Sequence, residues 1–244
     1  MIRVTHVTKF YGDQEILSDI SFEIGRGEIV VLLGESGSGK SVLLRHLIGL
    51  EKPDEGRITI DGVEITSLPE KRLLRVRKEI GYLFQDGALY DFLSVRENVA
   101  FPLREHTRLS WKEIWARTDA LLDSVGLGPA RDKMPSELSG GMNKRAALAR
   151  AVILDSRVLL CDEPTSGLDP IKSREITDLI RDISRKIDST TVITSHDMPN
   201  AFRIADRLIL LKDKRILKEG PPQEFIDSED EFVRKFLRAS EVSR

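Results

Sequence analysis

The chain has 244 residues, which is enough for one sizeable hydrophobic core, or for a core with an attached subdomain. Its 38 Lys and Arg residues nearly balance its 40 Asp and Glu residues and leave a net charge of −2, so nucleic acid is not expected as the main partner. The single cysteine, Cys161, excludes an internal disulfide and lies in an apolar run, which predicts a buried, unreactive thiol.

Turn signals and apolar runs predict strands and helices in alternation around a central helical stretch. The expected strands cover residues 2–7, 18–24, 28–33, 57–60, 157–161 and 190–194, with a closing hairpin at 207–211 and 215–217. Residues 86–155 are predicted to be helical, including a helix that Ser110 and Glu113 cap at its start. Asp169-Pro170 predicts the start of another helix between the last two strands of the core. This order predicts an α/β core interrupted by a helical insertion.

The segment Gly34-Glu-Ser-Gly-Ser-Gly-Lys40-Ser41 follows the third strand and precedes a helical pattern. It fits G-x-x-x-x-G-K-[ST], the P-loop pattern, in the strand–loop–helix setting that this motif needs. The glycines let successive backbone N–H groups turn toward phosphates, and the helix N-terminus adds a partial positive charge. Lys40 is expected to reach the β- and γ-phosphates, and the Ser41 hydroxyl to ligate Mg²⁺. The predicted nucleotide-binding residues of this loop are Gly34, Ser36, Gly37, Ser38, Gly39, Lys40 and Ser41.

A second set of candidate residues ends the apolar strand Val158-Leu-Leu-Cys-Asp162-Glu163. Paired acids rarely follow a buried strand unless a cation or a proton transfer uses them. Asp162 is expected to hold the Mg²⁺ shell, and Glu163 to orient and polarise the attacking water as general base. The plainer alternative is a solvated strand end whose acids cap a helix.

The segment Leu138-Ser139-Gly140-Gly141-Met142 opens another predicted helix. A Ser-Gly-Gly turn at a helix start is a second anion site, by the same backbone and dipole argument as for the P-loop. One chain cannot easily bring both sites to one γ-phosphate. We therefore predict a homodimer in which Ser139, Gly140 and Gly141 of each subunit face the P-loop of the other.

Together these motifs resemble the ATP-binding subunit of ABC transporters. They occur in the order of that family, as the P-loop, Gln85, residues 138–142, residues 158–163, Ser166-Gly-Leu-Asp169 and His196. The resemblance implies ATP and Mg²⁺ as ligands, with Tyr11 stacked on the adenine and Gln85 sensing Mg²⁺ and water. It also implies that the loop at Asp169 crosses the dimer interface and that His196 contacts the γ-phosphate. The plainer alternatives are a turn aromatic for Tyr11, a surface amide for Gln85 and a helix cap for His196.

The same resemblance implies an α/β fold of the P-loop NTPase (ABC ATPase) type, with an N-terminal antiparallel β subdomain and a helical subdomain insertion. We expect one ABC ATPase domain over residues 1–244. Its expected parts are a nucleotide-binding core (1–85 and 156–227), a helical subdomain (86–155) and a C-terminal helical tail (228–244). Apolar residues at helical spacing predict that the tail docks on this chain or on a neighbour.

In the segment from Phe84 to His106, Gly87-Ala-Leu89 and the run from Asn98 to His106 are similar to those of the Mla-type ATPases of bacterial phospholipid transport, as is the signature ending in Met142. In this family the segment faces the membrane subunit. The resemblance implies an integral membrane permease and an MCE-type lipid-binding protein as partners. No apolar stretch approaches the ~20 residues that cross a bilayer, and the N-terminus lacks a signal peptide. We therefore expect a cytoplasmic ATPase, peripheral on the inner face of the cell membrane, that meets the membrane only through its partner.

Three alternatives remain at this point. The ATPase of a polar-solute importer, for amino acids for example, would share every catalytic residue and differ only in its partner. A non-transport ABC protein acting on DNA or ribosomes would need tandem domains or a long coiled-coil insertion, and neither fits in 244 residues. A P-loop kinase for a small metabolite would leave residues 139–141 without a role.

Overall fold

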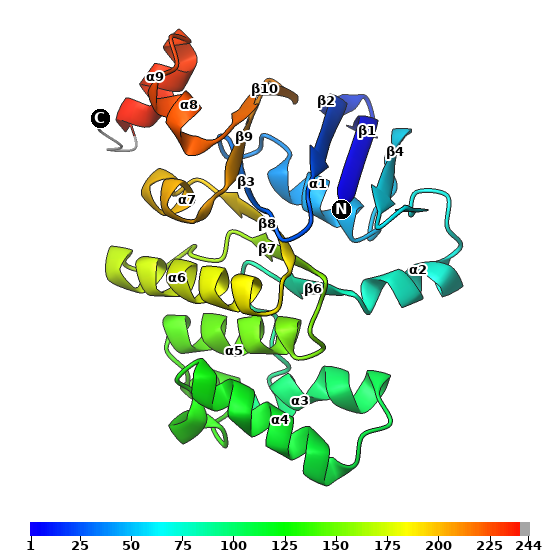
Figure 1. Cartoon of the computed structure of the whole chain (residues 1–244), viewed down its shortest axis with the longest axis vertical. Helices are drawn as coiled ribbons and strands as arrows, with labels where there is room; N and C mark the ends of the chain where they lie inside the picture. Colours follow the sequence, from blue (N-terminus) through cyan, green and yellow to red (C-terminus); the bar gives the residue numbers. More distant parts are fainter. Residues whose placement is uncertain (240–244) are drawn as a thin grey trace.

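Two β-sheets lie at the centre of the structure, a computed structural model that describes residues 1–239 (Figure 1). The first sheet is antiparallel, with the strand order β2-β1-β4-β5. Its strands are β1 (Ile2–Tyr11), β2 (Gln14–Ile24), β4 (Glu55–Ile60) and β5 (Val63–Glu64). Buried and exposed residues alternate in the second half of β2, as expected for a sheet with one face on the core. The predicted N-terminal antiparallel β unit is confirmed.

Within residues 1–239, the second sheet has six strands in the order β10-β9-β3-β8-β7-β6. They are β3 (Ile29–Leu33), β6 (Ile80–Leu83), β7 (Val158–Asp162), β8 (Thr190–Ser195), β9 (Arg207–Lys212) and β10 (Arg215–Gly220). All of these run parallel except β10, which pairs antiparallel with β9 at one edge. The carboxyl ends of parallel strands meet at one edge of a sheet. The segments that follow β3, β7 and β8 are therefore neighbours in space, although they are far apart in the sequence.

Helices cover the sheets and also form a layer of their own. The helices are α1 (Lys40–Leu47), α2 (Glu70–Arg77), α3 (Val95–His106), α4 (Trp111–Ser124), α5 (Gly140–Val152), α6 (Pro170–Lys186), α7 (Met198–Ile204), α8 (Pro222–Ile226) and α9 (Glu231–Ala239). In Figure 1, α6 and α5 lie between the six-stranded sheet and the pair α3 and α4, which form the end of the molecule away from β1. One apolar core joins α3, α4 and α5 to this sheet. The exact limits of the helical subdomain, 86–155, stay a prediction.

Two serines begin the helices of this outer layer. Ser94 caps α3 and Ser110 caps α4, each in a capping box with the glutamate three residues later. Glu113 Oε2 accepts the Ser110 N–H at 2.7 Å, while Ser110 Oγ accepts the Glu113 N–H at 3.4 Å. The predicted capping box is confirmed.

The structure differs from the sequence prediction mainly at strand ends. β1 continues to Tyr11 and β2 begins at Gln14, because the two strands stay paired up to their turn. β6 was not predicted, since a strand of this length is recognisable only when its neighbour β7 is known. Cys161 is fully buried, as expected, and burial raises the pKa of its thiol.

The described part of the C-terminal tail docks on this chain. Val233 and Leu237 of α9 are buried in the core shared with α7 and α8. Lys212 Nζ of β9 lies 3.7 Å from the centre of the Phe232 ring, a cation–π contact. The rest of the predicted tail, residues 240–244, lies outside the described residues.

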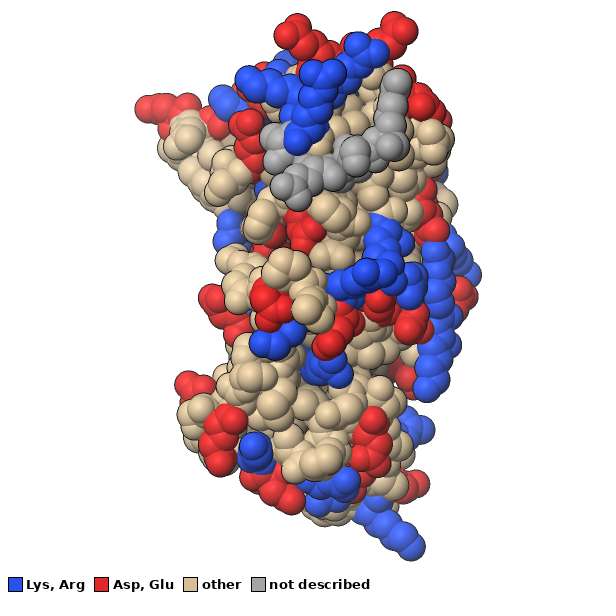
Figure 2. Space-filling model, turned by 90° about the vertical axis from the view of Figure 1, so that its left-hand side faces the viewer, with Lys and Arg blue, Asp and Glu red and all other residues tan. Residues whose placement is uncertain are grey.

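The surface is charged and mixed. Figure 2 shows Lys and Arg interspersed with Asp and Glu on the face that it presents. The basic run 71–78 largely forms α2, where the Arg77 guanidinium donates to the carbonyls of Ile48 and Gly49 just after α1. No helix in the part of the chain that the structure describes is long and apolar enough to cross a membrane.

Candidate functional site

The P-loop joins β3 to α1 and forms the floor of the site. Its glycines have positive φ, which L side chains rarely adopt, at Gly34 (154°), Gly37 (81°) and Gly39 (95°). The Lys40 side chain is 6 % exposed, and its Nζ donates to the carbonyls of Gly34 and Glu35 at 2.9 and 3.0 Å. Burial lowers the pKa of Lys40, and the nearby carboxylates of Glu163 and Asp162 oppose that shift. The P-loop therefore holds the Lys40 ammonium against its own backbone carbonyls.

Asp162, the last residue of β7, accepts hydrogen bonds from two hydroxyls. Ser41 Oγ donates to its Oδ1 at 2.8 Å, and Thr194 Oγ1 donates to the same oxygen at 2.7 Å. The Tyr82 hydroxyl lies 3.5 Å from the other oxygen, and burial together with the Asp162 charge raises the pKa of Tyr82. Hydroxyl and carboxylate oxygens are ligands that suit Mg²⁺. Two of the three side chains predicted for the Mg²⁺ site, Ser41 and Asp162, are thus in direct contact, and the third, Gln85, is described below.

Glu163 and His196 form a pair at the edge of the sheet. His196 Nδ1 lies 2.7 Å from Glu163 Oε2, and the other carboxylate oxygen lies 3.9 Å from Lys40 Nζ. The Glu163 side chain is only 13 % exposed, whereas the His196 side chain is 67 % exposed. The helix-cap alternative for His196 is wrong, because Asp197 caps α7.

A cleft of about 720 Å³ brings most of the predicted residues together. Its lining residues come from the β1–β2 turn, the P-loop, α1 and the segments after β6, β7 and β8. They are Tyr11, Gln14, Ile16, Ser36, Gly37, Gly39, Lys40, Ser41, Val42, Gln85, Glu163, Ser166 and His196. Gly34, Ser38 and Asp162 are not among its lining residues, although they belong to the same loop and strand end.

Tyr11 and Gln85 line the cleft from two different segments, the end of β1 and the segment after β6. Tyr11 ends β1, is 44 % exposed and donates its hydroxyl to Glu51. Burial and this hydrogen bond raise the pKa of Tyr11. Gln85 Nε2 lies 3.4 Å from Ser166 Oγ, so it contacts the segment that follows Glu163. No sequence motif points to Glu51, which holds the Tyr11 hydroxyl.

The predicted second anion site lies apart from this cleft. Ser139 caps α5 and accepts the Met142 N–H at 3.4 Å, and neither it nor Gly140 nor Gly141 lines the cleft. A Cβ on Gly140 would lie 3.3 Å from Leu168, which places the α5 start beside the loop that leads to α6. Asp169 caps α6, and hydrogen bonds from Lys172 lower the pKa of Asp169. One chain does not bring these residues to its own P-loop.

Basic residues to which no sequence motif points hold the segment that begins at Gln85. Lys144 of α5 is buried and donates its ammonium to the Gln85 carbonyl. Arg150 of the same helix donates to the carbonyls of Gly87 and Ala88 at 2.8 and 2.7 Å. A basic residue on the buried side of a helix was the only available signal. These bonds tie the helix that begins at residue 140 to a segment of the cleft lining.

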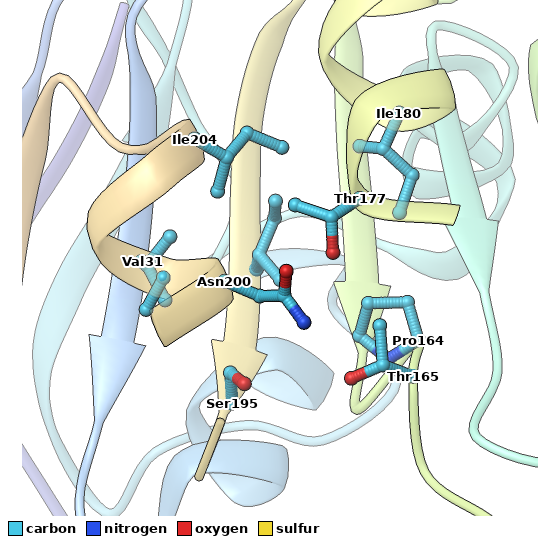
Figure 3. A pocket seen from close by; sticks show the side chains of 10 residues that line it. Val31, Pro164, Thr165, Thr177, Ile180, Ser195, Asn200 and Ile204 are labelled. Carbon is cyan, nitrogen blue, oxygen red and sulfur yellow. The ribbon is translucent and has the colours of Figure 1, made fainter. Parts of the chain in front are cut away.

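A small cavity of about 10 Å³ lies behind the strand ends (Figure 3). Its mostly apolar lining comes from β3, β8, α6, α7 and the segment after β7, and comprises Val31, Pro164, Thr165, Thr177, Ile180, Ile193, Ser195, Asn200, Ala201 and Ile204. This volume corresponds to about one water molecule. The cavity is a packing feature and not a ligand site.

A P-loop whose buried lysine faces a carboxylate and an imidazole in one open cleft defines a nucleoside triphosphatase of the P-loop class. The family described as ABC transporter matches residues 17–166, and the chain belongs to this family. It is therefore an ABC transporter ATPase, as the sequence analysis predicted. Its fold is also confirmed by the dimeric ATP-binding cassette MJ0796, solved in a post-hydrolysis state with ADP and Pi, which has a TM-score of 0.84 and 33% identity. That alignment covers 91% of this chain and 99% of the other.

Two kinds of sequence relative stand out. The chain is 44% identical to the probable ribonucleotide transport ATP-binding protein mkl of Mycobacterium leprae, over 99% of this chain and 70% of the relative. It is 40% identical to the intermembrane phospholipid transport system ATP-binding protein MlaF of Haemophilus influenzae, over 98% of this chain and 90% of the relative. The predicted likeness to Mla-type ATPases is confirmed.

Proposed function

We propose that this ATPase works as a homodimer that powers a separate membrane permease moving phospholipid. The observation that carries the lipid proposal is the alignment with MlaF, which spans 90% of that relative as well as 98% of this chain. An MCE-type lipid-binding protein is the expected third component. The chain would then lie peripherally on the cytoplasmic face of the membrane, held there by the permease.

Within each site, we assign ATP to the 720 Å³ cleft. Tyr11 would stack on adenine, while Lys40 and the loop residues Gly34, Ser36, Gly37, Ser38 and Gly39 would hold the phosphates. Ser41, Asp162 and Gln85 would hold Mg²⁺, which neutralises charge on the phosphates when bound. Ser139, Gly140, Gly141 and Asp169 of the second subunit would complete the site, since they do not line the cleft of their own chain.

Glu163 is the general base in this proposal. It is largely buried, which keeps solvent away from the carboxylate, and His196 holds one of its oxygens at 2.7 Å. A carboxylate in this position orients a water for attack on the γ-phosphate and accepts its proton. His196 lines the same cleft and would contact the γ-phosphate itself. Phosphoryl transfer depends mainly on such positioning and on electrostatic stabilisation.

The permease would dock at a groove of about 510 Å³ between α2, β6, α3 and α5. Two exposed aromatic side chains line it, Phe84 and Tyr90, and the ring of Phe92 lies 5.6 Å from that of Tyr90. Phe92 is 76 % exposed and lies beside the exposed Tyr90, and clustered exposed apolar side chains of this kind mark interaction sites. We call Phe84, Tyr90 and Phe92 the aromatic patch. The patch lies in the segment from Phe84 to His106, which contains the residues that are similar to the Mla-type ATPases.

The proposal is tested by purifying the tagged chain from solubilised membranes and identifying the proteins and lipids that accompany it. A permease with an MCE-type subunit and bound phospholipid is the expected result. A permease with a soluble solute-binding protein would favour the polar-solute alternative, which the name of the mkl relative keeps open. The absence of any membrane protein would overturn both.

A pair of variants tests the docking groove. Phe92→Ser is expected to lose the permease while keeping basal ATP hydrolysis, because the side chain is exposed and outside the cleft. Trp111→Ser on α4 is the matched control, since Trp111 is 54 % exposed but its ring pairs with Trp115 and does not belong to the aromatic patch. Equal recovery of permease with both variants would refute this docking site.

A further inference from the structure

Thr194 lies at the centre of the site, although no motif points to it. It is the penultimate residue of β8 and is fully buried. In the parallel sheet it is level with Asp162 on β7 and with Leu32 on β3, the strand that leads to the P-loop. The cleft does not expose it, so it can act only through its neighbours.

One hydroxyl of this residue serves two neighbours. Thr194 Oγ1 accepts the backbone N–H of Glu163 at 2.9 Å and donates to Asp162 Oδ1 at 2.7 Å. The chain of hydrogen bonds therefore runs from the backbone of one acid to the carboxylate of the other. Ser41 Oγ donates to the same Asp162 oxygen at 2.8 Å, so the P-loop helix joins this network.

The backbone of Glu163 gives this contact its importance. Glu163 has φ of 43°, a left-handed conformation that is uncommon for residues with a side chain. Such a conformation persists where the surroundings hold it in place, and it is typical of functional sites. The Glu163 N–H is the group that Thr194 holds, directly at this unusual residue. The direction in which the Glu163 side chain leaves the strand end depends on that backbone.

We propose that Thr194 is a positioning residue that ties the placement of Glu163 to the placement of the Asp162 carboxylate. This inference rests on the roles proposed above, Glu163 as base and Asp162 as part of the Mg²⁺ site. The Thr194 hydroxyl donates to Asp162 Oδ1, the oxygen that Ser41 also contacts, and thereby fixes the orientation of the carboxylate. The same hydroxyl holds the backbone from which the base projects.

Valine and serine separate the hydroxyl from the shape of the side chain. Thr194→Val keeps the branched shape but removes both hydrogen bonds, whereas Thr194→Ser keeps the hydroxyl and loses only a methyl group. Thr191→Val is the matched control on the same strand. Thr191 is also fully buried, and its Oγ1 bonds to Ser184 Oγ at 2.9 Å, remote from the cleft.

Three measurements on the full chain test the proposal, namely steady-state ATP hydrolysis, Mn²⁺ binding in the presence of ADP, and ADP binding without divalent metal. Thr194→Val is expected to lower hydrolysis and Mn²⁺ affinity by about 10–100-fold, as for other groups that orient a metal ligand. Its metal-free ADP affinity should match that of the wild type. Thr194→Ser and Thr191→Val should stay within about threefold of the wild type in all three measurements.

Several outcomes would overturn the proposal. One is Thr194→Val hydrolysing ATP and binding Mn²⁺ as well as Thr191→Val does. Another is a parallel loss of metal-free ADP binding, since that indicates general damage to the site. If Thr194→Val does not fold, Thr194→Ser decides the matter, because a folded serine variant with low activity contradicts a role for the hydroxyl. An active Glu163→Gln protein would instead refute the proposed base.

Discussion

Replacing Glu163 with Gln removes one negative charge and one proton acceptor from the cleft while nearly preserving the shape of the side chain. The carboxylate lies 2.7 Å from His196 Nδ1 and 3.9 Å from Lys40 Nζ, and its side chain is 13 % exposed. A Gln amide can still occupy this space and contact His196. The variant therefore isolates the chemical role of the carboxylate from its packing.

The expected loss follows from these contacts. General-base catalysis contributes roughly 10²–10⁴-fold, and each factor of ten corresponds to about 1.4 kcal/mol, so the barrier should rise by about 3–5 kcal/mol. Nucleotide binding should not weaken. Glu163 is a negative charge 3.9 Å from Lys40, and removing it leaves the lysine freer to attract phosphates.

The assay is phosphate release at saturating ATP, together with ATP affinity and the size of the protein in gel filtration with ATP. We expect hydrolysis near background, unchanged or tighter ATP binding, and an ATP-dependent dimer that persists because the nucleotide is not consumed. Glu175→Gln is the matched control. Glu175 is 52 % exposed and pairs with Arg145 at 2.7 Å, so its loss should change hydrolysis by no more than about twofold.

Hydrolysis by Glu163→Gln at a rate close to that of Glu175→Gln would refute the base assignment. A loss of ATP binding in parallel with hydrolysis would also count against it, because Glu163 would then contribute to nucleotide binding and not specifically to the chemical step. A drop in hydrolysis for both variants would show that the site responds to charge in general.

Three further predictions concern stability and the loop beside the cleft. Gly56→Ala should lower the free energy of unfolding in urea by several kcal/mol, because φ at Gly56 is 84° and the new Cβ would lie 2.3 Å from a backbone oxygen of β1. Gly12 is also at positive φ but in open space, so the control Gly12→Ala should cost only about 1–2 kcal/mol. Arg150→Met removes two hydrogen bonds to backbone carbonyls, so hydrogen exchange at residues 85–88 should accelerate while the exchange of β8 stays unchanged. A hydrogen bond from a backbone N–H of β1 lowers the pKa of Asp54 from 3.8. This carboxylate therefore stabilises the fold above pH ~4 and loses that effect as pH falls through its folded pKa. Asp54→Asn should flatten the acid limb of a curve of stability against pH, and an unchanged acid limb would contradict this.

The sequence predicted a feature reliably where all of its residues lie close together in the chain. The P-loop needs its glycines, lysine and serine in one continuous stretch, so its position and its strand–loop–helix setting could be predicted from the sequence. The capping box of Ser110 and Glu113 was predictable for the same reason, because its partners are three residues apart. The strand ending in Asp162 was likewise visible as an apolar run followed by acids.

The limits of the strands and the contacts that support the site residues were harder to predict from the sequence. β6 and the extended ends of β1 and β2 depend on pairing with partners that are distant in the chain or beyond a turn. Glu51 and Lys144 support Tyr11 and the Gln85 backbone from elements far away in the sequence. Neither residue belongs to a continuous motif.

The sequence by itself determined the class of site, since phosphate binding and proton transfer require particular residue types at fixed spacing. Only the tertiary structure decided how the parts meet. A parallel sheet places the ends of β3, β7 and β8 at one edge, which brings Lys40, Glu163 and His196 into one cleft and leaves residues 139–141 outside it. It also gives Thr194 its place between Asp162 and the Glu163 backbone. Hydrogen bonds depend on distances of about 3 Å in space, and separation along the chain does not reveal them.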